Sequence, residues 1–133
     1  MSASNFSGLA LPKPPPRWKA KQAKVTAEAK AQRECYAKVD RRDGPRCRIC
    51  LKRVGGMSLL SARIHHHLIY RSKGIIHEPW NVLSICVECD DAIHREGTLQ
   101  LHGDADLVDE RGQFCGVVVS RLIEAGWDVE RVA

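Results

Sequence analysis

The sequence has 133 residues, the length of one ordinary domain, and its apolar fraction of 44% is close to that of globular proteins. No window approaches the roughly 18 apolar residues that a membrane span needs. The opening MSASNFSGLA also lacks the basic start and apolar run of a secretory leader. These features argue against a membrane protein and favour an intracellular protein, which we expect in the cytoplasm.

The net charge of +5 is unevenly distributed along the chain. Residues 1–55 hold 14 Lys or Arg and four Asp or Glu, whereas residues 96–133 hold three basic and eight acidic residues. A basic N-terminal third is typical of a segment that binds a polyanion such as DNA, and it is equally typical of a solubilising tail. Charge alone therefore leaves both interpretations open.

The N-terminal arm, residues 1–24, is rich in proline and lysine, and we expect it to be extended and largely disordered. Thr26 is a candidate N-cap for a helix over residues 27–41, because its hydroxyl can satisfy a free backbone N–H. The stretch Asp43-Gly44-Pro45 should end that helix.

The remainder of the chain mixes short strands and helices, which predicts an α+β fold. In its middle we expect a strand, a polar loop, a second strand and a short helix, with the regular elements at residues 63–69, 81–85 and 87–95. A further strand is expected at GTLQLHG, residues 97–103. The stretch VVVSRLIEAG resembles a final helix ended by Gly126, although its valine run also favours a strand.

Four of the six cysteines form two C-x-x-C pairs, namely Cys47 with Cys50 and Cys86 with Cys89. In a reducing compartment such pairs are better explained as zinc ligands than as disulfides. Each C-x-x-C pair can form a knuckle that presents two sulfurs, so the two pairs together predict one structural Zn²⁺. Such an ion would stabilise a domain with a small core. The alternatives are four buried free cysteines or a redox pair, which lacks a thioredoxin-like context. Cys35 and Cys115 are expected to be buried.

Asp90 and His94 are spaced i and i+4 in the helix expected at residues 87–95, so they should lie on one face, one turn apart. A carboxylate and an imidazole at that spacing can bind one divalent ion. The histidine run at residues 65–67, on the preceding strand, is the obvious source of a third ligand. Three protein ligands leave open positions, which is typical of a catalytic rather than a structural metal site.

These residues carry a resemblance to a known family. The pattern HH-L-I-x-R-S, followed by N-V-L-x-x-C-x-x-C-D-x-x-x-H, resembles the HNH endonuclease family. The upstream RDGPRCRIC resembles the zinc-knuckle half of the members that carry four cysteines, and the whole match covers residues 38–100. The resemblance implies the ββα-metal fold, in which a hairpin and a helix hold one divalent cation.

The resemblance also implies a role for each matching residue. His67 stands at the position of the general base, and His66 stands at the adjacent metal-ligand position. Asn81 matches the central asparagine, which braces the loop between the two strands. Asp90 and His94 match the remaining metal-ligand positions.

The departure from the family pattern is Asp90, where His or Asn is commonest. An aspartate suits a hard ion such as Mg²⁺ or Mn²⁺, with Ni²⁺ or Zn²⁺ as further candidates. Strand alternation places His65 and His67 on one face and His66 on the other, so a second register stays open, with His65 as ligand and His66 as base. Asp91 is an alternative to Asp90.

Other charged residues have weaker assignments. Arg71 and Arg95 flank the expected site and either contact DNA phosphates or are plain solvated arginines. His77 and His102 have no motif partner and are expected in surface loops.

The resemblance implies a metal-dependent endonuclease that hydrolyses DNA phosphodiester bonds and leaves 5′-phosphate and 3′-hydroxyl ends. The expected nuclease domain covers residues 25–133, with a motif core at 47–95 and a C-terminal extension at 96–133. The alternatives are a non-catalytic zinc-knuckle DNA-binding module and a protein-interaction module. A phage or mobile element, and hence a host cytoplasm, is a common setting for stand-alone family members. So small a nuclease would need a partner protein to direct it or would have little sequence preference.

Overall fold

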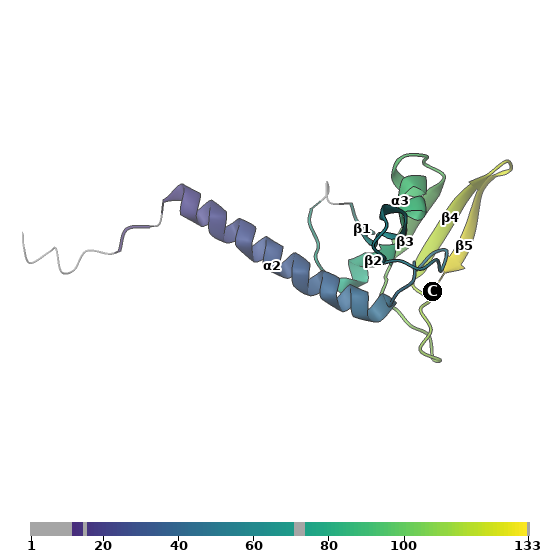
Figure 1. The fold of residues 1–133 in the computed structure, drawn as a ribbon, viewed down its shortest axis with the longest axis horizontal. Coiled ribbons are helices and arrows are strands. Elements are labelled where there is room, and N and C mark those ends of the chain that lie inside the picture. The colour runs from purple at the N-terminus through teal and green to yellow at the C-terminus, as the bar shows by residue number, and fades with distance from the viewer. Residues whose placement is uncertain (1–11, 15, 71–73, 133) are drawn as a thin grey trace, which may run out of the picture. The chain divides into compact units, whose positions relative to one another are not determined.

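A computed structural model describes residues 12–14, 16–70 and 74–132 of the chain. The chain divides into two compact units, Met1–Lys30 and Ala31–Ala133. Among the described residues, no helix combines the length and apolar character that a membrane span requires. The first unit holds the beginning of a long helix, and the second holds the strands and the remaining helices (Figure 1).

Helix α2 spans Arg17–Asp43 and therefore begins well before residue 27, where we expected it. The stretch KAKQAKVTAEAKAQ is rich in Ala, Lys, Gln and Glu, which have high helix propensity, so the helix starts as soon as the prolines end. The carbonyl of Pro16 accepts the backbone N–H groups of Lys19 and Ala20 at 3.0 and 3.2 Å. Residues 17–24, expected as part of an extended arm, are helical instead, and residues 1–11 and 15 lie outside the described residues.

Thr26 lies inside α2 and is not its N-cap, which corrects the sequence prediction. Its hydroxyl donates a hydrogen bond to the carbonyl of Gln22, one turn back, at 2.9 Å. The predicted helix end is confirmed, because α2 stops at Asp43 and Gly44 adopts a φ of 66°.

The two parts of α2 differ in burial. Every side chain from Arg17 to Glu28 is exposed, whereas Cys35 and Val39, in the second unit, pack against Val82. The burial of Cys35 confirms its prediction. Cys115 is only half-buried, which corrects its placement in the core.

The predicted order of strand, loop, strand and helix is confirmed. Strand β1, Ile64–His67, pairs antiparallel with β2, Val82–Ile85, so that His67 lies opposite Val82. Helix α3, Val87–His94, follows directly after β2 and contacts β1. Both strands are slightly shorter than the expected ranges of residues 63–69 and 81–85. Just beyond the His67–Val82 pair, the backbone N–H of Leu68 donates to the carbonyl of Asn81 at 2.7 Å. Short 3₁₀ helices, η1 at Leu59–Ser61 and η3 at Pro79–Asn81, precede the two strands.

A second sheet is formed by β3, β4 and β5, which span Leu99–Gly103, Val117–Ile123 and Gly126–Val132. The final helix expected at residues 117–126 is therefore wrong. The β-branched run from Val117 to Val119 pairs with β3, where Val119 lies opposite Leu101 and both are buried. Gly126 has a φ of 115° and begins β5 opposite Ile123, so it closes a hairpin turn instead of ending a helix.

Candidate metal centres

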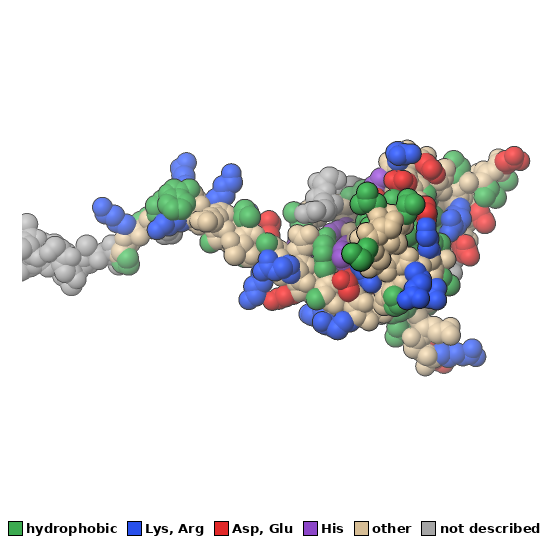
Figure 2. Space-filling model, in the orientation of Figure 1, with side chains coloured by type: hydrophobic (Ala, Val, Ile, Leu, Met, Phe, Trp, Pro, Cys, Tyr) green, Lys and Arg blue, Asp and Glu red, His purple; other side chains and the backbone are tan. Residues whose placement is uncertain are grey.

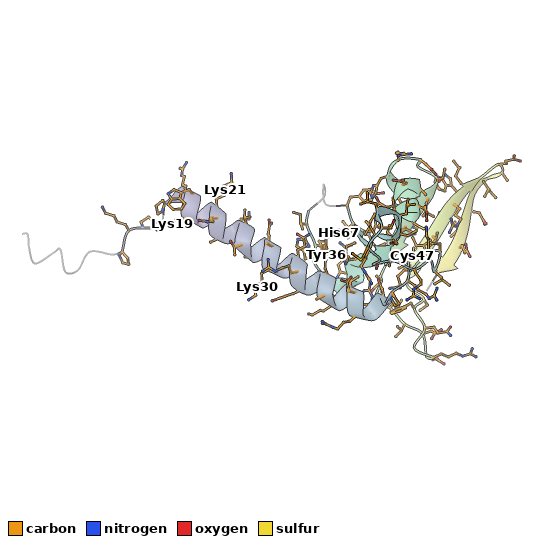
Figure 3. All side chains as sticks on the ribbon, viewed as in Figure 1. Lys19, Lys21, Lys30, Tyr36, Cys47 and His67 are labelled. Carbon is orange, nitrogen blue, oxygen red and sulfur yellow. The ribbon has the colours of Figure 1, made fainter. Side chains whose placement is uncertain are left out.

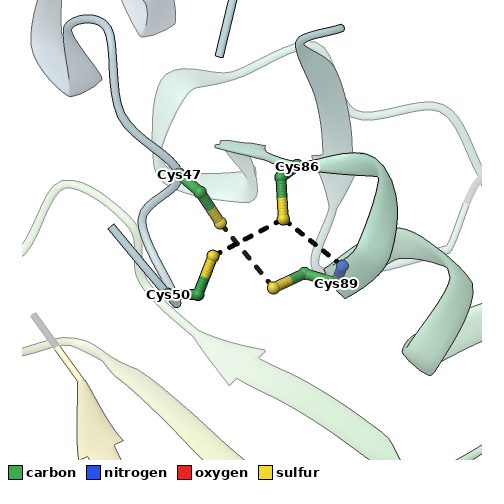
Figure 4. A group of neighbouring side chains, drawn as sticks. All are labelled: Cys47, Cys50, Cys86 and Cys89. Carbon is green, nitrogen blue, oxygen red and sulfur yellow. Dashed lines mark hydrogen bonds between the residues drawn. The ribbon is translucent and has the colours of Figure 1, made fainter. Parts of the chain in front are cut away.

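The cysteine group, Cys47, Cys50, Cys86 and Cys89, is brought together by two knuckles (Figure 4). In the first, the backbone N–H of Ile49 points at the sulfur of Cys47 at 3.4 Å. In the second, at the start of α3, the N–H of Cys89 points at the sulfur of Cys86 at 3.5 Å. Each knuckle thus turns its backbone amides toward a sulfur, which favours the thiolate form that a metal ligand requires.

The sulfur positions fit a tetrahedral zinc site. The Cys47 and Cys89 sulfurs lie 3.8 Å apart, and those of Cys50 and Cys86 lie 3.5 Å apart. Four sulfurs at about 2.3 Å from one ion are separated by about 3.8 Å in a regular tetrahedron. The cysteine group can therefore bind a metal ion such as zinc.

The thiols of Cys47, Cys86 and Cys89 differ in pKa. The Cys89 thiol donates to the Cys47 sulfur, which lowers the pKa of Cys47 to about 4 and raises the pKa of Cys89. Burial raises the pKa of Cys86 to about 11. A thiolate at Cys47 is already in the form that binds a metal ion, and metal binding would release the protons of Cys86 and Cys89.

A second cluster, the histidine–aspartate group, consists of His66 on β1 with Asp90 and His94 on α3. One ligand atom from each lies within 4.8 Å of the others. Oδ1 of Asp90 is 3.4 Å from Nε2 of His94, one helical turn away, and the ring centroids of His66 and His94 are 5.4 Å apart. The structure thus brings together the three residues that the sequence suggested as ligands of a catalytic ion.

The histidine–aspartate group opens into a cavity of about 500 Å³, which we call the first hollow. Burial, and after it the charges of His94 and His67, lower the pKa of His66 to about 4. At neutral pH its imidazole is therefore uncharged and has a lone pair to offer an ion. The residues that line the first hollow are His65, His66, His67, Tyr70, Asp90, Ile93 and His94.

The histidine run keeps the alternation of a strand. The ring of Tyr36 on α2 lies 3.9 Å from the ring of His65 and 6.1 Å from that of His67, so these two face the helix (Figure 3). His66 points the other way, toward His94. All three nevertheless line the first hollow.

His65 is held apart from the histidine–aspartate group. Its Nε2 lies 2.6 Å from Oδ1 of Asp40 on α2, and its ring stacks on Tyr36 with planes only 9° apart. These contacts occupy the side chain that the alternative register would use as a metal ligand. Asp91, the other alternative ligand, is absent from the histidine–aspartate group among the residues the structure describes.

Asn81 connects the two ends of the loop between β1 and β2. Its Oδ1 accepts the backbone N–H of Ile69 at 2.8 Å, and its Nδ2 donates to the carbonyl of Ile76 at 3.1 Å. Asn81 itself is fully buried, and both bonds are partly shielded from water. Asn81 therefore holds the segment that follows His67 in place.

Sequence reasoning missed two aromatic neighbours of the histidine run, of which Tyr70 lines the first hollow. Tyr70 packs within 6.3 Å of His66 and 6.0 Å of His94, measured between ring centroids. His77, expected in a surface loop without a partner, is half-buried with its ring 5.7 Å from that of His67. Neither residue has a local spacing signal, because both lie outside the regular elements that carry the motif.

The remaining predicted residues lie farther out. Arg95 is exposed at the C-terminal end of α3, and Arg71 lies outside the described residues. His102 is exposed as expected, although it stands in β3 and not in a loop. Comparison with protein-family models, with curated proteins and with solved structures found no match to this chain.

Proposed function

We propose that this protein is a metal-dependent endonuclease that hydrolyses DNA phosphodiester bonds, with β1, β2 and α3 forming a ββα-metal unit of the HNH type. The observation that carries the proposal is the meeting of His66, Asp90 and His94 in the first hollow, with His67 in its wall. Two imidazoles and one carboxylate suit a divalent ion such as Mn²⁺, and Mg²⁺, Ni²⁺ or Zn²⁺ are further candidates.

The proposed chemistry assigns the histidines different tasks. His67 accepts a proton from the water molecule that attacks phosphorus, a task suited to a neutral imidazole near pH 7. The bond from phosphorus to the 3′-oxygen then breaks, and that oxygen takes up a proton from solvent, leaving 5′-phosphate and 3′-hydroxyl ends. His66, Asp90 and His94 would hold a divalent ion, which would supply Lewis-acid stabilisation of the charge that develops on the phosphate.

Two further features support the proposed site. Asn81 fixes the chain directly after His67 through its bonds to Ile69 and Ile76. The general base His67 is therefore already in position before the substrate binds. The cysteine group stands at the N-terminus of α3, the helix that carries Asp90 and His94. A zinc ion there would anchor the helix and so hold the catalytic ligands in register.

The proposed partner is DNA, and the first unit offers a surface for it. Its helical part carries exposed Lys and Arg side chains (Figure 2). Lys19, Lys21 and Lys24 are among them, and Glu28 is the single acidic residue from Arg17 to Lys30. Such a helix can contact phosphates without reading sequence. Arg95 is a second candidate for a phosphate contact.

The deciding experiment is cleavage of supercoiled plasmid by the zinc-loaded protein with Mg²⁺, Mn²⁺ or Ni²⁺, with EDTA as the metal-free control. The His67→Ala variant should lose cleavage while it keeps its fold, its zinc and its affinity for DNA. The matched control Glu124→Gln alters an exposed residue of the β4–β5 turn and should cleave like the wild type.

The cleavage assay, together with a measurement of DNA binding, separates the nuclease proposal from its two alternatives. Intact DNA binding with no cleavage by the wild type under any metal would favour the non-catalytic DNA-binding module. Absence of salt-sensitive DNA affinity would favour a protein-interaction module. The ratio of nicked to linear product would report whether one strand or both are cut.

A further inference from the structure

A second hollow, of about 380 Å³, adjoins the first. It lies between the chain that follows β1 and the middle of β3, and its lining residues are Leu68, Ile69, Tyr70, Gln100, Leu101 and His102. Tyr70 also lines the first hollow, so its side chain is the wall that the two hollows share. Whatever occupies the second hollow is therefore adjacent to the histidine–aspartate group.

The position of Tyr70 suits contact with a ligand. Its side chain is 47% exposed, although its ring lies edge-on to His66 and near His94. Because about half of this aromatic side chain is open to solvent, much of its apolar ring surface is available for contact with a ligand. Because the ring centroid is 6.3 Å from His66 and 6.0 Å from His94, a phosphate held at that group would bring the attached nucleoside within reach of Tyr70.

The chemistry of the second hollow matches a nucleobase. The buried residues Leu68 and Leu101 contribute apolar atoms to its lining, while the exposed side chains of Gln100 and His102 supply an amide and an imidazole. A nucleobase has two flat apolar faces and an edge of hydrogen-bond donors and acceptors. Stacking on an aromatic ring combined with polar contacts at the edge is the way that proteins hold unpaired bases.

We infer that the second hollow binds the base of a nucleotide next to the scissile phosphate, with the base stacked on Tyr70. The inference rests on the proposed function, since it is the phosphate at the histidine–aspartate group that brings the nucleotide there. A base stacked on a side chain must leave the duplex stack, which costs least where it is already unpaired, so the preferred substrate class is DNA with an unpaired nucleotide at the cut. Gln100 and His102 then contact the edge of that base.

The test compares two DNA duplexes of one sequence, one fully paired and one with a short unpaired bubble that carries 2-aminopurine. The wild type should cleave the bubble with the higher kcat/KM. Tyr70→Leu should lower kcat/KM on the bubble about tenfold or more, because loss of base stacking on an aromatic side chain has that size. Tyr70→Phe, which keeps the ring, should retain most of the activity. Trp127→Leu removes an exposed aromatic residue of β5 and should change nothing.

A binding readout makes the inference testable apart from catalysis. In the His67→Ala background, binding of the bubble DNA should quench the 2-aminopurine fluorescence through stacking, and Tyr70→Leu should abolish the quench. Cleavage of both duplexes at equal rates by the wild type and by Tyr70→Leu would overturn the base site and leave the nuclease proposal standing. If the wild type cleaves nothing, the proposed function fails. A quench that depends on Tyr70 would then still support the base site, and its absence would overturn that as well.

Discussion

Oδ1 of Asp43 lies 2.7 Å from Nη1 of Arg48, and both side chains are almost completely buried. The same carboxylate accepts the backbone N–H of Ser84 on β2 at 2.9 Å and pairs with Arg42 at 2.7 Å. The guanidinium of Arg48 also lies 3.9 Å from the ring centroid of Phe114. One buried carboxylate therefore joins the end of α2, the first cysteine knuckle and the strand that leads to α3.

Replacing Asp43 by Asn should destabilise the second unit strongly. The change removes the charged carboxylate that pairs with the buried guanidinium of Arg48. Breaking a buried ion pair from one side costs about 3–5 kcal/mol. Urea denaturation of the zinc-loaded protein measures the free energy of unfolding. Glu124→Gln, at an exposed position, should stay within about 0.5 kcal/mol of the wild type. A similarly small change for Asp43→Asn would contradict the structural role assigned to this carboxylate.

The contribution of Asp43 should depend on pH with a definite sign. Burial raises the pKa of Asp43, but hydrogen bonds from Arg42 and the N–H of Ser84, together with the charge of Arg48, outweigh burial and hold it below the ordinary value of 3.8. The stabilisation is therefore fully present above the unfolded-state pKa and is lost as the pH falls through 3.8 toward the folded-state pKa.

The difference in unfolding free energy between wild type and Asp43→Asn isolates this contribution from other acid effects such as loss of zinc. That difference should be constant near neutral pH and shrink in acid. A difference that grows as the pH falls would contradict the predicted loss of stabilisation by Asp43 in acid.

Metal removal should unfold the second unit. Binding of a structural zinc contributes about 10–16 kcal/mol of apparent free energy, which is comparable to the whole stability of a small domain. Chelation should therefore abolish the cooperative thermal transition, and added zinc should restore it.

Cys50→Ser should reproduce this loss even though Cys50 is the exposed member of the cysteine group. Cys115→Ser, outside the group, should bind zinc like the wild type. Metal analysis of both variants checks this expectation. A Cys50→Ser variant that keeps its zinc, or a chelated wild type that keeps a sharp thermal transition, would decide against a structural zinc.

The basic helix of the first unit should set the salt dependence of DNA binding. Replacing Lys19, Lys21 and Lys24 by Gln removes three exposed positive charges. Lys19 and Lys21 are labelled in Figure 3. Each lost phosphate contact on duplex DNA should reduce the slope of log K against log salt by about 0.9, so the slope should fall by up to about 2.7.

Fluorescence anisotropy at several salt concentrations, in the His67→Ala background, measures this slope. Arg121→Gln, an exposed site on β4, serves as the control. If the triple variant keeps the wild-type slope, the helix is a solubilising segment and not a DNA contact.

Several features of the fold and the candidate site followed from local sequence signals. The stretch Asp43-Gly44-Pro45 ends a helix because glycine admits a positive φ and proline lacks an N–H. The C-x-x-C spacing forms knuckles through contacts within a few residues. Asp90 and His94 share a helix face because their spacing matches one turn. These signals depend only on nearby residues, so they can be recognised before the fold is known.

Other features were decided by the tertiary structure. The valine run at the start of β4 is compatible with helix or strand, and pairing with β3 settles it. The helix at residues 17–24 is a different case, because its side chains are exposed and local helix propensity, which the sequence prediction underestimated, accounts for it.

The sequence by itself therefore determined which side chains can bind metal and the order of the short elements around them. The tertiary structure alone decided that His65 turns to Asp40, that Asp43 bridges three segments, and that Tyr70 stands between two hollows. The physical reason is the distance along the chain over which a sequence signal acts. Spacing along a chain reports neighbours within one turn or one strand pair, whereas these contacts join residues that only the packing of separate elements brings together.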